Sequence, residues 1–184
     1  PASKDELIAA DNEKAPVRFI AFRLSCAKGI FDLPELVQEA RLSLPTRQIV
    51  VAGSGPASED LQRALPDAVF LGWQTREQLA SLYLGLDLFV FPSRFDTFGN
   101  VLLEAFTHGM PAVAYNCKGP KDILEHRVSG YLTEDVSTMA EAVVEFFSAS
   151  NDRNVMAENA RKRAARFQAE PIMRQLLAGL GLDH

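Results

Sequence analysis

Cysteines and basic runs are both scarce in this sequence. The two cysteines, Cys26 and Cys117, lie far apart and in none of the spacings typical of a metal site. We therefore expect two reduced thiols, as in a cytoplasmic protein, rather than a disulfide framework. No stretch of five or more Lys and Arg residues occurs, and the net charge is −5. A chain without such a basic run is a poor candidate for binding nucleic acid.

Long apolar runs are missing as well. No run approaches the roughly 18 consecutive apolar residues of a membrane-spanning helix, and the first residues do not form the charged and then apolar segment of a secretory leader. Hydrophobic residues nonetheless make up 47% of the 184 residues, which is enough for the core of one domain. We expect residues 1–15, which are polar, to be a linker or N-terminal tail. Residues 16–184 then form the domain, with 151–184 as its C-terminal helices.

Short apolar runs rich in β-forming residues alternate with segments of helical periodicity along the domain. Strands that alternate with helices predict a parallel sheet covered by helices on both faces. The expected fold class is therefore α/β, a Rossmann-like doubly wound parallel sheet of about six strands. The predicted strands are 17–22, 47–52, 68–72, 87–91, 111–115 and 130–132. Helices are predicted at 31–44, 58–65, 75–84, 101–108, 137–147, 151–167 and 169–182, with Ser58, Thr75 and Ser137 as N-terminal caps and with Gln78 completing a capping box.

The most distinctive stretch of the chain runs from Ser93 to Phe106. It follows the apolar strand 87–91 and leads into a helix that stops before Gly109, so the order is strand, polar loop and helix. In a parallel α/β sheet such a loop lies at the carboxyl edge of the strands, where ligands bind. The start of the helix presents backbone N–H groups to an anion. We therefore expect the functional site here.

Glu104 stands out in the helix of that stretch. It is the only formally charged residue between Asp96 and Lys118, on a segment that is otherwise apolar. A carboxylate in such surroundings needs hydrogen-bond donors. One interpretation is an acid near a helix N-terminus, worth about 1 kcal/mol or less. The other is a carboxylate that accepts from two vicinal hydroxyls of a ribose.

The segment 93–114 resembles the signature of the family 4 glycosyltransferases, retaining enzymes of the GT-B fold. The shared pattern is Pro-Ser, a carboxylate, Phe-Gly, seven residues from that carboxylate to Glu104, then Glu-Ala, Gly and Pro-x-Val. The chain departs from the pattern at Asp96, where the family usually has Glu. The resemblance extends over almost the whole chain from Val17 onward. A complete GT-B enzyme has two Rossmann-like domains with the active cleft between them, and this chain resembles the C-terminal half, which binds the donor nucleotide.

The resemblance assigns roles to two cations and two carboxylates. Arg23 and Lys28 stand where the family holds the diphosphate of the nucleotide, although by position alone they could be ordinary charges of a surface loop. Cations at that place would stabilise the negative charge that grows on the departing diphosphate. Glu104 would bind the ribose hydroxyls, and Asp96 would face the sugar with a side chain about 1.5 Å shorter than that of Glu. Phe22 is a second departure, because the family has Gly before this Arg.

Further residues are assigned to the nucleotide by the same resemblance. Gly53 and Gly55 correspond to a Gly-x-Gly-Pro turn near the nucleotide, and they lack the third glycine of a dinucleotide fingerprint. The family reads the base with the backbone just after Gly72, which indicates Trp73 and Gln74. That Trp73 merely packs a corner of the domain is an equal alternative. Backbone N–H groups at the helix start would assist with the diphosphate, and the residues are Thr97, Phe98, Gly99, Asn100, Val101 and Leu102.

The resemblance implies transfer of a hexose from a UDP-sugar or a GDP-sugar to a hydroxyl of a glycan or lipid. It implies no cofactor and no metal, and the sequence has no Asp-x-Asp motif. The acceptor, and any membrane contact, would belong to an N-terminal domain that precedes this chain. Two alternatives remain, a non-catalytic nucleotide-sugar-binding module and another GT-B enzyme such as a sugar-nucleotide epimerase. His108, at the end of the helix, is expected to be structural rather than a catalytic base.

Overall fold

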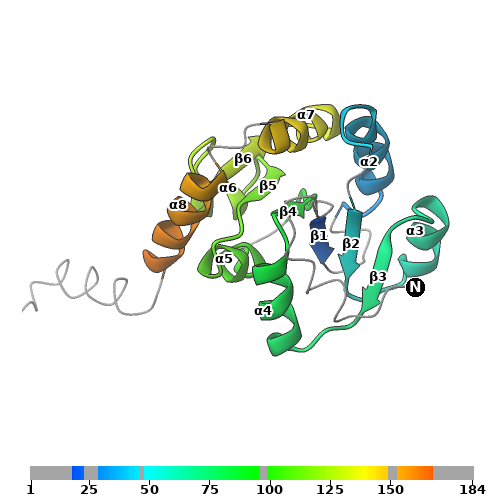
Figure 1. Cartoon of the computed structure of the whole chain (residues 1–184), viewed down its shortest axis with the longest axis horizontal. Coiled ribbons are helices and arrows are strands. Elements are labelled where there is room, and N and C mark those ends of the chain that lie inside the picture. Colours follow the sequence, from blue (N-terminus) through cyan, green and yellow to red (C-terminus); the bar gives the residue numbers. More distant parts are fainter. Residues whose placement is uncertain (1–17, 23–28, 46–47, 96–98, 149–152, 168–184) are drawn as a thin grey trace, which may run out of the picture.

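The chain folds around one parallel sheet (Figure 1). The structure is a computed structural model and describes residues 18–22, 29–45, 48–95, 99–148 and 153–167. Six strands lie in the order β3-β2-β1-β4-β5-β6, and every neighbouring pair is parallel. In this order the chain grows outward in one direction from β1 and then in the other from β4, as in doubly wound nucleotide-binding sheets. The strands are β1 (Arg18–Phe22), β2 (Gln48–Ala52), β3 (Val69–Gly72), β4 (Leu88–Phe91), β5 (Ala112–Tyr115) and β6 (Gly130–Thr133).

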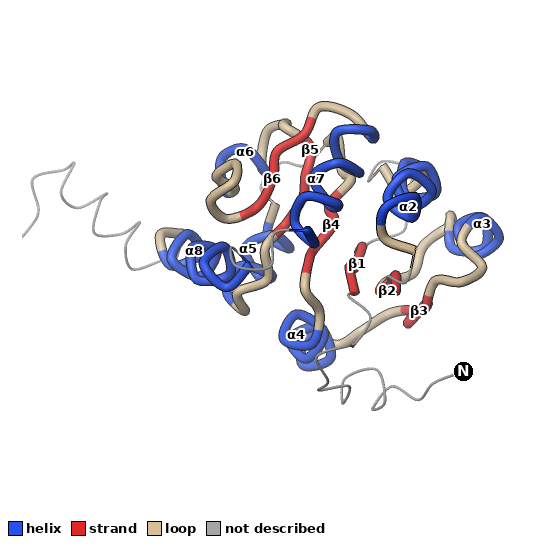
Figure 2. The backbone as a smooth tube through the Cα atoms, turned by 45° about the horizontal axis from the view of Figure 1, so that its top comes forward, coloured by secondary structure: helices blue, strands red, loops and turns tan. Residues whose placement is uncertain are grey.

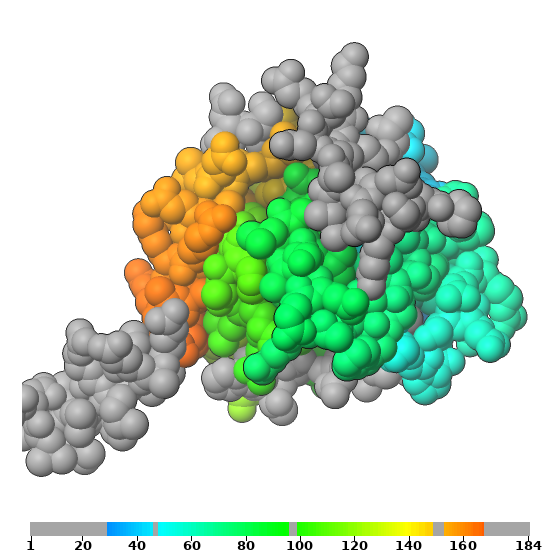
Figure 3. Space-filling view, turned by 60° about the horizontal axis from the view of Figure 1, so that its bottom comes forward, coloured from blue at the N-terminus to red at the C-terminus, as the bar shows by residue number. Residues whose placement is uncertain are grey.

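Helices cover both faces of the sheet (Figures 1 and 2). One core cluster joins the sheet to α2 (Asp32–Ser43), α3 (Ser58–Ala64) and α7 (Val136–Ser148). The other joins it to α4 (Arg76–Gly85), α5 (Asn100–Thr107) and α8 (Arg153–Ala165), with the short α6 (Pro120–Ile123) beside α5. Figure 3 shows this second side, where α4 (green) lies between α3 (cyan) and α8 (orange). No helix in the described ranges has the length and apolar character needed to cross a membrane.

Strand β4 shows why helices must cover both faces of the sheet. Successive side chains of a strand point to opposite faces, and all four residues of β4 are buried. Leu88 and Val90 belong to the α2 and α7 side of the core, whereas Phe89 and Phe91 belong to the α4 and α5 side. A strand with both faces buried reads as a continuous apolar run, which is the pattern of the sequence.

The structure confirms the predicted α/β fold and all six predicted strands. Thr75 caps α4 in the predicted capping box, since its side chain accepts from the N–H of Gln78 and the Gln78 side chain accepts from the N–H of Thr75. Two other predicted caps are wrong. Ser58 is the first helical residue of α3 and not its cap, and Asp135, rather than Ser137, accepts from an N–H of the first turn of α7, that of Thr138. The predicted segments 1–15 and 169–182 lie outside the described residues.

All six strands run in the same direction, so the loops that follow them meet at one edge of the sheet. This carboxyl edge consists of the residues that follow each strand, up to the next helix. Its described parts are 29–31 after β1, 53–57 after β2, 73–75 after β3, 92–95 and 99 after β4, 116–119 after β5, and 134–135 after β6. The start of α5, which carries the family signature, therefore lies among the loops that follow the neighbouring strands.

Candidate functional site

Five of the predicted site residues fall outside the described parts of the chain: Arg23, Lys28, Asp96, Thr97 and Phe98. The residues that flank these two segments are described, and they show how the loops of the carboxyl edge meet. The geometry that follows concerns the helix start, the residues expected near the base, and Glu104.

Gly29 joins the loop after β1 to the loop after β4. Its φ is +65°, and a Cβ atom on this residue would lie 1.7 Å from the carbonyl oxygen of Pro92. No side chain fits so close to a backbone oxygen, so glycine is required both by its conformation and by the space. The end of the first loop is thereby held against the first residue after β4.

The start of α5 is fixed by Gly99. This residue caps the helix in the left-handed conformation, with φ 72° and ψ 35°, and a Cβ atom would lie 3.0 Å from Cδ1 of Ile123 on α6. The N–H of Leu102 donates to the carbonyl of Gly99 at 2.9 Å, and the Leu102 side chain is fully buried. The preceding N–H groups, those of Asn100 and Val101, have no carbonyl four residues earlier within the helix. Asn100 is exposed, so this turn opens to the surface.

A backbone hydrogen bond joins the loop after β2 to the last residue of β3. The N–H of Gly53 donates to the carbonyl of Gly72 at 2.7 Å. Ser58 closes the Gly53–Gly55 turn, because its hydroxyl donates to the carbonyl of Gly55 at 2.6 Å and accepts from the N–H of the same residue at 3.0 Å. Gly53 and Gly55 thus lie beside the turn that carries Trp73.

Trp73 and Gln74 are adjacent in sequence but opposite in exposure. Trp73 is 72% exposed and does not pack into a corner of the domain, whereas Gln74 is 7% exposed. Nε2 of Gln74 donates to the carbonyls of Leu71 at 2.7 Å and Trp73 at 2.9 Å. Its Oε1 is buried and has no hydrogen-bond partner among the described residues. The Gln74 amide therefore stabilises this turn from within, while the indole of Trp73 faces outward.

Glu104 lies half-buried on α5 beside α4. The hydroxyl of Tyr83 on α4 is within 3.5 Å of its Oε2. Among the described residues no cation forms an ion pair with Glu104. His108 contacts the backbone instead, with Nδ1 2.8 Å from the carbonyl oxygen of Glu104. Since a carbonyl only accepts, Nδ1 carries the proton, and His108 ends the helix as the sequence predicted.

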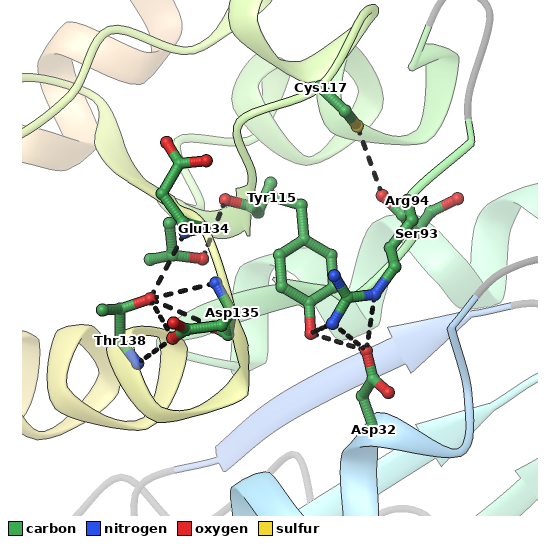
Figure 4. A network of polar contacts seen from close by, with 10 residues as sticks. Asp32, Ser93, Arg94, Tyr115, Cys117, Glu134, Asp135 and Thr138 are labelled. Atoms are coloured by element: carbon green, nitrogen blue, oxygen red, sulfur yellow. Dashed lines mark hydrogen bonds and ion pairs between the residues drawn. The ribbon is translucent and has the colours of Figure 1, made fainter.

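Sequence reasoning missed a polar cluster on the other side of the carboxyl edge. Figure 4 shows that Asp32 at the start of α2, Arg94 in the loop after β4 and Tyr115 at the end of β5 converge. Nε and Nη2 of Arg94 donate to Oδ2 of Asp32 at 3.2 and 3.1 Å. The Tyr115 hydroxyl donates to the same oxygen at 2.6 Å. The one available signal was that all three lie at the same edge: Tyr115 ends a predicted strand, Asp32 is in the first turn of a predicted helix, and Arg94 lies in the loop after a predicted strand.

A second carboxylate, that of Asp135, lies near this cluster (Figure 4). The backbone N–H and the hydroxyl of Thr138 both donate to it, at 2.8 and 2.7 Å. These hydrogen bonds hold the pKa of Asp135 below its usual range, and the positive charge of Arg94 contributes in the same direction. Although acids gather here, no group of three or more His, Cys, Asp and Glu side chains among the described residues is placed to hold a metal ion.

The chain is similar to glycosyltransferases over most of its length. The family described as glycosyl transferases group 1 matches residues 4–163. A GDP-mannose-dependent alpha-mannosyltransferase of Corynebacterium glutamicum is 37% identical over 114 residues, which are 62% of this chain and 26% of that protein. The alpha-D-kanosaminyltransferase of Streptomyces kanamyceticus is 33% identical over 157 residues, which are 79% of this chain and 40% of that protein. The chain thus spans two fifths or less of the length of these relatives.

Solved structures share the fold. Anabaena Alr3699/HepE, crystallised in complex with UDP, has a TM-score of 0.76 and 25% identity, and the match covers 90% of this chain and 48% of that one. The C-terminal domain of the group 1 glycosyltransferase LpcC from Francisella tularensis has a TM-score of 0.73 and 22% identity, with 84% of this chain and 88% of that domain covered. The described domain therefore resembles one Rossmann-like half of a GT-B glycosyltransferase. Fold, signature segment and family match agree: this chain belongs to the group 1 glycosyltransferases.

Proposed function

We propose that the chain is the donor-nucleotide-binding half of a retaining glycosyltransferase, which moves a hexose from a nucleoside diphosphate sugar to a hydroxyl of a glycan or lipid. The observation that carries the proposal is how few partners the Glu104 carboxylate has among the described residues. This half-buried carboxylate has no cation partner among the described residues, and Tyr83 is its one side-chain hydrogen-bond partner there. An ionised carboxylate has about four acceptor positions. The remaining positions suit the two vicinal hydroxyls of a ribose.

The diphosphate would lie at the start of α5. The N–H groups of Asn100 and Val101, together with the positive end of the helix dipole, form an anion site of the kind found in many nucleotide-binding folds. Arg23 and Lys28 would add two full positive charges as the leaving diphosphate gains negative charge. Asp96 would face the sugar. The contact between Gly29 and Pro92 supports this arrangement, because it holds the end of the first loop beside the start of the second.

The base would lie over the turn after β3. In this proposal the backbone of Trp73 and Gln74 reads the edge of the base, and the Gln74 amide keeps that backbone in one conformation. The exposed indole of Trp73 is available for stacking. Because one similar structure contains UDP and one relative is named as GDP-mannose-dependent, uracil and guanine are the two bases to test.

The proposal is tested by titrating the chain with UDP, GDP and ADP while recording NMR spectra of the backbone amides. We expect one of the three to bind in the micromolar range, with shifts at Asn100, Val101, Trp73 and Glu104. AMP, UMP and GMP serve as controls, since a monophosphate presents less charge to the diphosphate site. If none of the three diphosphates binds at about 1 mM, the proposed function is wrong.

A further inference from the structure

Tyr83 is held in one orientation by its neighbours. Its side chain is 3% exposed. The ring stacks on His108, with centroids 5.3 Å apart and an angle of 24° between the planes, and it meets Phe89 edge-on with centroids 6.4 Å apart. A ring fixed between a strand and a neighbouring helix cannot turn its hydroxyl elsewhere without repacking the core. The position of the hydroxyl oxygen is therefore a property of the fold.

That hydroxyl lies beside a carboxylate for which the described residues provide no other side-chain donor. The Tyr83 hydroxyl lies 3.5 Å from Oε2 of Glu104. Hydrogen bonds from a hydroxyl to a carboxylate are usually about 2.5–2.7 Å long, so this contact is a weak one. A weakly bonded, half-buried carboxylate is costly unless further donors reach it.

The phenol also differs from the donors that usually meet a buried carboxylate. Burial raises the pKa of Tyr83 well above its ordinary value, and the nearby charge and hydrogen bond of Glu104 raise it further. Tyr83 therefore remains a neutral donor at physiological pH. A Lys or Arg at this place would neutralise Glu104 and compete with hydroxyl groups for it, whereas a phenol occupies one acceptor position and leaves the negative charge in place.

We propose that Tyr83 is a positioning residue for sugar recognition: it sets the plane of the Glu104 carboxylate so that the remaining acceptor positions meet the hydroxyls of a ribose. This inference rests on the proposed function, since it concerns the same carboxylate. Its consequence is selectivity. The chain distinguishes ribonucleotides from 2′-deoxyribonucleotides through Glu104, and Tyr83 contributes by orienting that residue rather than by touching the nucleotide.

The experiment compares Tyr83→Phe with the unchanged chain in isothermal titrations with UDP and 2′-deoxy-UDP, and with GDP and 2′-deoxy-GDP. For whichever base binds, the unchanged chain should prefer the ribonucleotide by about tenfold. Tyr83→Phe should reduce that preference to about threefold while the affinity for the deoxynucleotide changes by less than about twofold. Tyr131→Phe is the matched control, because Tyr131 is also buried, at 5% exposed, but belongs to the core on the other face of the sheet. It should keep the full preference.

The variant Glu104→Gln separates the role of Glu104 in the proposed function from the positioning role of Tyr83. This variant should lose most of the ribose preference, and adding Tyr83→Phe to it should cause no further loss, because Tyr83 acts through Glu104. If Tyr83→Phe keeps the full preference while Glu104→Gln loses it, the inference about Tyr83 is wrong and the proposed function stands. Equal weakening of ribo- and deoxynucleotides by Tyr83→Phe would also overturn it, since a purely structural role has that effect. If Glu104→Gln keeps the preference, or the unchanged chain binds no diphosphate, the proposed site and the inference fail together.

Discussion

The guanidinium of Arg94 lies 4.1 Å from the ring centroid of Tyr115, and both side chains donate to the same carboxylate oxygen of Asp32. A planar guanidinium can stack on an aromatic ring while its edge donates hydrogen bonds, which an ammonium group cannot do. The three residues come from the loop after β4, the end of β5 and the start of α2. These three residues, called the polar anchor from here on, therefore join the loop after β4 to the end of β5 and the start of α2.

Replacing Arg94 by Lys should lower the free energy of unfolding by about 1 kcal/mol, because the charge remains but the paired donors and the stacking are lost. The Arg94–Asp32 pair is only partly exposed, with the Asp32 side chain 25% accessible. Arg63→Lys is the control, since Arg63 pairs with Asp60 on an exposed face of α3. That change should alter the free energy of unfolding by less than about 0.5 kcal/mol. Urea titrations measure both, and equal losses would show that the anchor adds no stability.

Alkaline pH should destabilise the chain through Tyr115. Burial raises the pKa of this phenol, and its hydrogen bond to Asp32 raises it further. The folded chain therefore keeps a proton that the unfolded chain loses near pH 10, so the contribution is complete below about pH 10 and falls as the pH rises above it. Urea unfolding from roughly pH 8 to pH 11 should show a shallower decline for Tyr115→Phe than for the unchanged chain. Parallel curves would contradict this assignment.

The sheet could be predicted from sequence because its determinants are local. Each strand is a short apolar run between turn residues, and strand β4, with all four residues buried, is the clearest case. The helix caps were harder to predict than the strands. Both Ser137 and Asp135 have side chains suited to capping, and the choice depends on whether the first helical residue is Val136 or Thr138. Glu104 was found because a lone charge in an apolar helix is visible in the sequence itself.

The polar anchor could not be predicted in the same way. Asp32 and Tyr115 are 83 residues apart, and Asp32 and Arg94 are 62 apart. The sequence around each residue gives no sign of these contacts. Asp32 is accounted for as the start of a helix, Arg94 as a loop residue and Tyr115 as the end of a strand. The exposure of Trp73 could not be predicted from the sequence either, because it depends on the turn at Gly72, whose φ is +66°. Contacts between loops become visible only when the strand order is known.

Gly29→Ala should destabilise the fold strongly. A Cβ atom would meet the carbonyl oxygen of Pro92 at 1.7 Å, so the backbone must move in addition to the strain of a left-handed alanine. Gly72→Ala is the matched control, because Gly72 has nearly the same φ but nothing within 4 Å of a Cβ atom. The control should cost about 1 kcal/mol, from strain alone, and Gly29→Ala at least about 2 kcal/mol more. Thermal and urea unfolding measure the free energy of unfolding of both variants. Similar losses of stability would show that the loops are not in contact there.

Glu104→Gln should weaken nucleotide binding while leaving the fold intact. Charged hydrogen bonds are worth about 1.5–3 kcal/mol, so the affinity for the preferred nucleoside diphosphate should fall about tenfold or more. The neutral amide still fills the same volume, and the melting temperature should therefore change little. Glu39→Gln, on α2 beneath the other face of the sheet, controls for a general change in charge. Calorimetric titration measures the affinities, and an unchanged affinity would remove Glu104 from the site.

The last expectation concerns activity: this chain alone should bind a nucleoside diphosphate but transfer no sugar. The donor-side residues of the proposal lie within it, whereas the chain spans two fifths or less of its curated relatives. Correct orientation of two reactants can account for roughly 7–11 kcal/mol of a barrier, and the acceptor would have to be oriented by a second domain. The assay incubates the chain with radiolabelled UDP-sugars and GDP-sugars and a mixture of glycans and lipids, alongside the Corynebacterium glutamicum mannosyltransferase supplied with GDP-mannose. Comparable turnover by both would show that the chain is a sufficient enzyme by itself and overturn its assignment as one half of a larger one.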